Sequence, residues 1–228
     1  MTNRWYSVFK AVLGPFLVVW NRPTINGADH IPDTGPALLV SNHQAVMDSF
    51  YLPLMVRRQL TFPAKSEYFT TPGLKGAIQK WFFTAVGQVP LDRQSESAGD
   101  ALQAAAHRVL ERGELFGIYP EGTRSPDGRI YKGRTGVARL AMAEGVPVVL
   151  TGMVGTRDAN PIGSTFPRPA KVHIEISEPI DPHAWAKENG FDPASREVAR
   201  PFTDYLMHKL AALTGYDYVD VYASEVKE

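Results

Sequence analysis

The chain has 228 residues, of which 44% are hydrophobic and 11% aromatic, a composition that can fill the core of one large domain or two small ones. Lysine plus arginine (24) equals aspartate plus glutamate (24), so the overall charge does not indicate a nucleic-acid binder, and an anion site requires a local cluster of positive charge. The absence of cysteine excludes disulfides, thiolate zinc ligands and a cysteine nucleophile.

The first element is an apolar segment over residues 5–20, WYSVFKAVLGPFLVVW. Gly14-Pro15 interrupts it, and its apolar run is shorter than the roughly 20 residues that a membrane-spanning helix needs. A signal peptide fits poorly, because NRPTING follows where a small-residue cleavage site would stand. Tryptophans at both ends, with Arg4 and Lys10, suit a helix that lies among lipid headgroups; a core helix docked on the domain is the alternative.

After a loop over residues 21–36, rich in proline and glycine, the body of the chain alternates between strand and helix patterns. Strands are predicted at residues 37–41, 60–65, 88–92, 115–120, 146–154 and 171–179, and helices at 48–58, 75–87, 97–113, 136–145 and 195–215. This order predicts an α/β fold: a single domain with a largely parallel, or mixed, sheet flanked by helices. We therefore divide the chain into an N-terminal interfacial helical segment, residues 1–22, and a domain over residues 23–228.

Polar motifs follow two of the predicted strands. SNHQAVMD (residues 41–48) ends the strand at 37–41, and YPEGTRS (residues 119–125) ends the strand at 115–120. In open α/β sheets, ligands bind outside the carboxyl ends of the strands. We therefore expect both motifs to face one site.

The first motif contains a histidine and an aspartate five positions apart. On one continuous helix they would point about 140° away from each other, so they meet only if His43 stays on the strand end and Asp48 begins the next helix. The carboxylate could then accept the Nδ1–H of His43 and leave Nε2 to withdraw a proton from a hydroxyl. Taken alone, the spacing favours a capping aspartate beside a structural histidine.

The second motif combines Glu121, Gly122, Thr123 and Arg124. Glycine lets the backbone approach a ligand, the threonine hydroxyl can donate, and a guanidinium fits phosphate oxygens with two parallel hydrogen bonds. Between Arg124 and Arg139, five basic residues stand against one acidic residue. The pattern is compatible with a phosphate site, and a solvated loop is the alternative, with Arg139 expected in solvent.

NHQAVMD, GQVPLDR and YPEGTRS, in this order, resemble the motifs of the glycerolipid acyltransferase family, which includes glycerol-3-phosphate and 1-acylglycerol-3-phosphate acyltransferases. The first and third match the family's N-H-x-x-x-x-D and F/Y-P-E-G-T-R-S blocks without gaps, and the resemblance covers residues about 35 to 180. VPVVLTG matches a fourth block only partly, because Leu150 replaces its second proline. FPAKSEYF and YKGRTGVARLA also resemble family segments, which draws Lys65, Lys132 and Gly133 toward the site.

The resemblance implies transfer of a fatty acyl group from acyl-CoA or acyl carrier protein to a hydroxyl of a phosphorylated glycerol, with 1-acylglycerol 3-phosphate as the favoured acceptor and phosphatidic acid as the product. It makes His43 the general base and Asp48 its orienting partner. The substrate-binding residues that it implies are Lys65, Arg93, Glu121, Gly122, Thr123, Arg124 and Lys132. We expect Glu121 to anchor Arg124 or another basic side chain.

The same resemblance predicts no cofactor beyond the thioester co-substrate. No H-E-x-x-H motif or carboxylate cluster suggests a metal, and the balanced charge suggests no nucleic-acid partner. Its lipid substrates imply a membrane surface as a partner, at the cytoplasmic face, and favour the interfacial interpretation of residues 5–20. Residues 68–83 either add to that surface or pack on the sheet. The alternatives are acylation of glycerol 3-phosphate or of another lysolipid or glycolipid, and a non-catalytic lipid-binding module.

Overall fold

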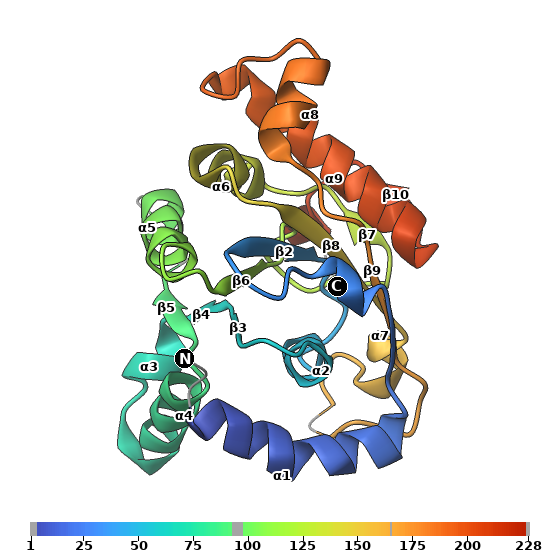
Figure 1. Cartoon of the computed structure of the whole chain (residues 1–228). Helices are drawn as coiled ribbons and strands as arrows, with labels where there is room; N and C mark the ends of the chain where they lie inside the picture. The colour runs from blue at the N-terminus through green and yellow to red at the C-terminus, as the bar shows by residue number, and fades with distance from the viewer. Residues whose placement is uncertain (1–3, 93–97, 165, 227–228) are drawn as a thin grey trace.

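The computed structural model describes residues 4–92, 98–164 and 166–226, except for the side chain of Lys75 (Figure 1). A six-stranded sheet with the order β1-β9-β8-β2-β6-β3 forms its centre. These strands span Thr24–Asn26 (β1), His173–Ile176 (β9), Val148–Val154 (β8), Ala37–Ser41 (β2), Leu115–Ile118 (β6) and Leu60–Thr61 (β3). Neighbouring strands are parallel except β8 and β9, which are antiparallel. The predicted α/β class with a mostly parallel sheet is confirmed.

Two smaller sheets of two strands each lie outside this centre. β4 (Pro63–Lys65) pairs with β5 (Val89–Leu91), and β7 (Ile130–Tyr131) pairs with β10 (Tyr218–Val219). The single strand predicted at residues 60–65 is thus two strands, because β3 joins the main sheet while β4 leaves it to pair with β5.

Helices cover both faces of the sheet. The longer ones are α1 (Arg4–Asn21), α2 (Asp48–Met55), α4 (Gly73–Ala85), α5 (Ala98–Leu110), α6 (Gly136–Glu144) and α9 (Ala199–Thr214). Shorter ones that the sequence did not predict are α3 (Glu67–Thr70), α7 (Thr156–Ala159) and α8 (Pro182–Glu188), with 3₁₀ turns at Ala28–His30, Arg196–Val198 and Ala223–Glu225. Pro201 lies in the first turn of α9, where its missing N–H leaves no helical bond unmade.

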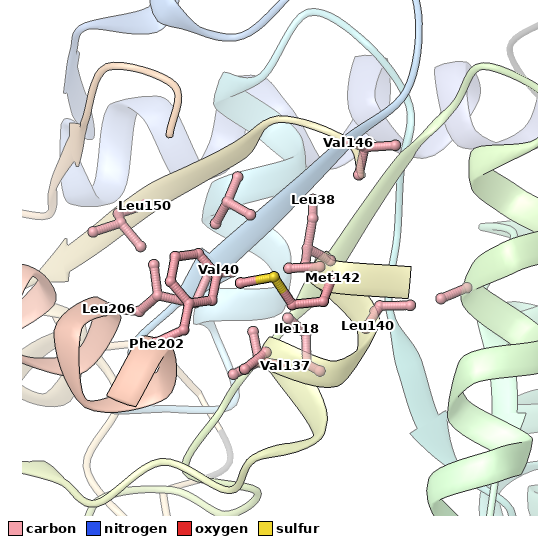
Figure 2. Close-up of a cluster of buried hydrophobic side chains, with 14 of the residues drawn as sticks. Leu38, Val40, Ile118, Val137, Leu140, Met142, Val146, Leu150, Phe202 and Leu206 are labelled. Atoms are coloured by element: carbon pink, nitrogen blue, oxygen red, sulfur yellow. The ribbon is translucent and has the colours of Figure 1, made fainter. Parts of the chain in front are cut away.

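The core is divided by the sheet. Alternate side chains of β2 point to opposite faces, as the pleat requires, so Leu38 and Val40 join one cluster while Leu39 joins the other. The first cluster includes Phe202 of α9 and side chains of α6 (Figure 2). The second lies under α2 and α1 and includes Leu17. Because both faces are covered, the central strands are continuous apolar runs, as the sequence showed.

Helix α1 lies beyond α2 on the outside of the second cluster (Figure 1). It buries a narrow face that includes Tyr6 and Leu17, and Gly14 brings its backbone close to Leu54 of α2. The rest of its surface is exposed and largely apolar, so features of both predicted alternatives, a docked helix and an interfacial helix, are present. Among the described residues, no helix combines the length and apolar character needed to cross a membrane. The domain division at residue 22 stays a prediction.

Candidate active site

The two motifs leave the sheet at one edge, as predicted. β2 and β6 are neighbouring parallel strands with Val40 opposite Ile118, so the chain enters both motifs at the same level. Asn42 then fixes the point of departure, because its side-chain amide donates to the carbonyl of Met153 (2.9 Å) and accepts from the Met153 N–H (2.7 Å). This buried amide continues the strand pairing with β8 for one more step and positions His43 after it. This role of Asn42 was not predicted from the sequence.

His43 and Asp48 meet in the predicted way. His43 Nδ1 is 2.9 Å from Asp48 Oδ2, and the aspartate side chain is 0% exposed. The same oxygen accepts the N–H groups of Gln44 (2.7 Å) and Ala45 (2.9 Å), so it is the acceptor of the Nδ1–H as well. Asp48 therefore closes the turn before α2 and also fixes the histidine ring. Nε2 is the ring nitrogen left for a substrate.

The imidazole face is held by a row of aromatic rings. The ring of Tyr119 stacks on His43 with centroids 4.0 Å apart and an interplanar angle of 12°. Phe62 stacks on the other face of Tyr119, at 5.0 Å and 9°. The Tyr119 hydroxyl is 3.0 Å from Ser49 Oγ on α2, a hydrogen bond that fixes the ring between β6 and α2.

Glu121 holds the backbone of His43. Its buried carboxylate accepts the His43 N–H at Oε1 (3.2 Å) and the Tyr131 N–H at Oε2 (3.1 Å). The expectation that Glu121 anchors Arg124 is wrong: its partners are backbone N–H groups, which sequence patterns do not reveal. The pKa of Glu121 is raised to about 8: burial is the largest cause, the two backbone hydrogen bonds oppose the shift, and the charge of Asp48 adds to it.

The second motif also binds the carbonyl side of the histidine. The Ser125 N–H donates to the His43 carbonyl (2.7 Å), so Glu121 and Ser125 hold both backbone polar groups of one residue. Arg157, on the unpredicted α7, donates to the carbonyls of Ser125 (2.8 Å) and Pro126 and fixes the loop from outside. Gly122 occupies the left-handed region (φ 74°), a conformation that favours glycine. Arg157 was not predicted from the sequence, because a four-residue helix gives no periodic signal.

A cavity of about 290 Å³ lies beside His43. Its polar lining includes Lys65, Thr123 and Arg124, and Arg124 forms no hydrogen bond or ion pair with any residue that the structure describes. Much of its apolar lining comes from three helices: Phe9, Leu13 and Leu17 of α1, Phe50 and Leu54 of α2, and Phe82 and Phe83 of α4. The site thus brings His43, basic and hydrogen-bonding side chains, and apolar side chains together around one cavity.

The five basic residues of residues 124–139 do not gather at one site in the structure. Arg129 pairs with Asp127 at 2.6 Å, and the guanidinium of Arg134 lies over the ring of Tyr222. Arg139 is exposed and donates to Thr135, as expected for a solvated residue. Of the five basic side chains between residues 124 and 139, all of them described, Arg124 alone lines the cavity.

Lys132 corrects the predicted substrate-binding set. Its ammonium pairs with Asp220 at 3.0 Å, and it does not line the cavity, because β7 turns it toward the C-terminal segment. The neighbouring Gly133 packs closely against Met207 of α9. Arg93, which the resemblance placed in the phosphate site, lies outside the described residues.

The fold and the site together define an α/β protein with a carboxylate-supported histidine beside an apolar cavity. An acyltransferase family model matches residues 22–153, more than half of the chain, and the chain belongs to the acyltransferase family.

The chain also resembles individual members of that family. It is 34% identical, over 68% of its length and 44% of the relative's, to a chloroplastic 1-acyl-sn-glycerol-3-phosphate acyltransferase of Brassica napus. It is 33% identical, over 68% of its length and 43% of the relative's, to a chloroplastic relative from Arabidopsis thaliana with the same described activity. The crystal structure of the 1-acyl-sn-glycerophosphate acyltransferase PlsC from Thermotoga maritima matches 90% of this chain and 76% of that one, with 28% identity and a TM-score of 0.66. The chain spans less than half the length of the two plant relatives.

Proposed function

We propose that this protein transfers a fatty acyl group from a thioester, acyl-CoA or acyl carrier protein, to a hydroxyl of a phosphorylated glycerol. The favoured acceptor is 1-acylglycerol 3-phosphate, which gives phosphatidic acid in phospholipid synthesis. The observation that carries the proposal is that His43, with Asp48 on its Nδ1, lines one cavity with Arg124 and with apolar side chains of three helices. The described activities of the relatives support the same acceptor.

The proposed reaction needs one proton carrier. His43 Nε2 takes the proton of the acceptor hydroxyl while that oxygen bonds to the thioester carbonyl carbon. The carbon–sulfur bond then breaks, and the departing sulfur takes the proton back from the imidazolium to leave as a thiol. Asp48, hydrogen-bonded to Nδ1, stabilises the imidazolium in between. Transfer is direct, without an acyl-enzyme, a metal or a cofactor.

Binding of the acceptor phosphate is assigned to Arg124, Thr123 and Lys65. The Arg124 guanidinium has no bonded partner among the described residues, so its five N–H groups are available to phosphate oxygens. Glu121 and Gly122 act on this subsite through the shape of the loop, since Glu121 binds backbone N–H groups and Gly122 forms the turn. Arg93 stays a predicted contributor.

The protein is proposed to work at the cytoplasmic face of a membrane. Leu13 of α1 lines the cavity and is also 38% exposed, so the apolar lining continues onto the exposed apolar surface of that helix. An acyl chain could then move between bilayer and cavity without crossing water, which would cost about 0.8 kcal/mol for each CH₂ group exposed.

The test is an assay of the purified protein that crosses two donors, acyl-CoA and acyl carrier protein, with four acceptors. These are glycerol 3-phosphate, both lysophosphatidate isomers and a monoacylglycerol, which lacks the phosphate. We expect thiol release and phosphatidic acid with lysophosphatidate, much less product with the monoacylglycerol, and a loss of roughly 10²- to 10⁴-fold for His43→Ala.

Two outcomes would contradict the proposal. Acyl transfer by His43→Ala at the wild-type rate would refute the base assignment. No transfer from either donor to any acceptor would leave a non-catalytic lipid-binding protein.

A further inference from the structure

The exposed apolar side chains are concentrated in a few elements. Fourteen large hydrophobic side chains are exposed in the part of the chain that the structure describes. Eight lie on α1 (Trp5, Val8, Val12, Leu13, Phe16, Val18, Val19 and Trp20) and three on α4 (Leu74, Ile78 and Trp81). Another, Phe166, is 79% exposed between α7 and β9, in an element to which neither the sequence nor the proposed function assigns a role. A one-sided concentration of this kind marks an interaction surface.

Phe166 belongs to a loop that is fixed to the end of α1. We call residues 166–171 the Phe166 loop. The indole N–H of Trp20 donates to the Pro167 carbonyl (3.0 Å), and the Asn21 amide donates to the carbonyls of Arg168 (2.7 Å) and Ala170 (3.0 Å). Phe16 and Trp20 stack beside this junction, with ring centroids 5.7 Å apart. The exposed apolar surface of α1 therefore continues onto the Phe166 loop.

The opposite end of α1 is joined to α4. Trp5 and Trp81 make an edge-to-face contact with centroids 5.4 Å apart, and Phe9 contacts Phe82 at 5.0 Å. With both ends fixed, α1 lies along the body, with α4 at one end and the segment between α7 and β9 at the other (Figure 1). A flat surface that approaches the exposed face of α1 can touch all three elements.

The charge of these elements fits an anionic surface. Residues 4–22, 73–85 and 166–171 contain seven basic residues and no acidic one, in a chain whose net charge is zero. Within the described ranges, Arg22, Arg168 and Lys171 form no ion pair. Each basic residue near a bilayer that contains anionic lipid adds about 1 kcal/mol of attraction.

We propose that the Phe166 loop is a second membrane contact, in which Phe166 enters the interfacial region of an anionic bilayer and Arg168 and Lys171 bind lipid phosphates. This inference deepens the membrane placement in the proposed function and rests on it. The loop anchors the end of α1 that α4 does not reach, so α1 lies parallel to the bilayer along its whole length. The cavity rim at Leu13 then faces lipid.

The absence of native cysteine allows a direct test. Phe166→Cys in the full chain is labelled with an environment-sensitive dye and mixed with phosphatidylcholine/phosphatidylglycerol vesicles. We expect a blue shift and a rise in emission at this position. Val221→Cys is the matched control, because Val221 is 41% exposed and lies outside the three elements; its dye should stay in water. Unchanged emission at position 166, whether or not the protein co-sediments with vesicles, would overturn the proposal.

Affinity supplies the second measurement. Phe166→Ser should weaken vesicle binding about ten-fold, because one large apolar side chain is lost from the interface. Arg168→Gln with Lys171→Gln should weaken binding to anionic vesicles about thirty-fold and leave binding to pure phosphatidylcholine vesicles unchanged. Wild-type affinity in both variants would overturn the proposal. These measurements contain no substrate, so a protein that fails the acyl-transfer assay can still pass them, and an active enzyme can fail them.

Discussion

Two buried carboxylates hold the same histidine, and they do so in different ways. Asp48 binds the imidazole ring, and the same oxygen accepts the backbone N–H groups of Gln44 and Ala45. Glu121, from the neighbouring strand end, binds the backbone N–H of His43 and leaves its ring untouched. Asp48 acts on Nδ1 of the ring whose other nitrogen, Nε2, a reaction would use, whereas Glu121 acts on the position from which the side chain projects.

The two carboxyl groups therefore have different roles: Asp48 in proton transfer, and Glu121 in holding the backbone of the site. Charge on the histidine ring changes during proton transfer, and a carboxylate on Nδ1 responds to that change directly. A carboxylate on a backbone N–H meets no change of charge; its effect is on geometry and on the free energy of folding. Glu121 is buried among the backbone groups that it holds, and this burial is the main reason that its pKa is raised to about 8. Substitutions that replace each carboxyl group by an amide of the same size should expose the contrast.

The largest effect is expected for Asp48→Asn. The amide oxygen can still accept the N–H groups of Gln44 and Ala45, so the turn should survive. The same oxygen also accepts the Nδ1–H of His43, so the tautomer should survive while the negative charge that stabilises the imidazolium is lost. We expect kcat to fall by roughly 10²- to 10⁴-fold with little change in the melting temperature. Wild-type kcat in a folded Asp48→Asn protein would remove Asp48 from the mechanism.

Glu121→Gln should show the opposite result, a clear loss of stability with a smaller loss of kcat. The carboxamide offers one oxygen to two backbone donors, so the N–H of His43 or of Tyr131 loses its acceptor. An unsatisfied buried donor costs about 1–3 kcal/mol, which urea unfolding would detect. We expect kcat to fall much less than in Asp48→Asn. Glu178→Gln, at an exposed position, is the matched control and should change neither quantity.

If Glu121→Gln lowered kcat as far as Asp48→Asn and left stability unchanged, the contrast between the two carboxylates would fail. Glu121 would then be part of the proton chemistry.

The pH dependence of the free energy of unfolding tests the role of Glu121 in a second way, with a smaller expected effect. The pKa of Glu121 is raised from 4.5 to about 8 by burial, so between these values the folded chain holds a proton that the unfolded chain has released. The contribution of this group to the free energy of unfolding is complete below pH 4.5 and is lost as the pH rises toward about 8. Glutamine does not titrate, so the advantage of wild type over Glu121→Gln should shrink across this window. Parallel pH profiles would contradict the raised pKa.

The sequence predicted the parts of the site that depend on local order. A strand followed directly by Asn-His, and then by an aspartate at the start of a helix, leaves one geometry in which His43 and Asp48 can meet. Alternation of strand and helix was enough to place both motifs on one sheet edge. These are short-range patterns, and the structure contains them.

The rest depends on contacts between distant segments. The partners of Glu121 are N–H groups that every non-proline residue carries, so no residue type indicates them. Lys132 was placed in the site because YKGRTGVARLA resembles a segment of the family, but the chain that follows β7 pairs Lys132 with Asp220. Arg157 stands on a helix of four residues, too short for any periodicity to predict.

The smallest effect is expected for Tyr119→Phe, which probes a third support of His43, the stacked ring. Phenylalanine keeps the ring stacked between His43 and Phe62 and loses the hydroxyl bonded to Ser49. One hydrogen bond is worth about 0.5–1.5 kcal/mol, so we expect a small fall in melting temperature and a change in kcat of a few-fold. Tyr119→Leu removes the stacked ring as well. It should lower kcat further, because the His43 imidazole is then no longer held in its orientation by stacking. A Tyr119→Phe protein as inactive as Asp48→Asn would show that the hydroxyl takes part in proton transfer, and the two-carboxylate account of His43 would be incomplete.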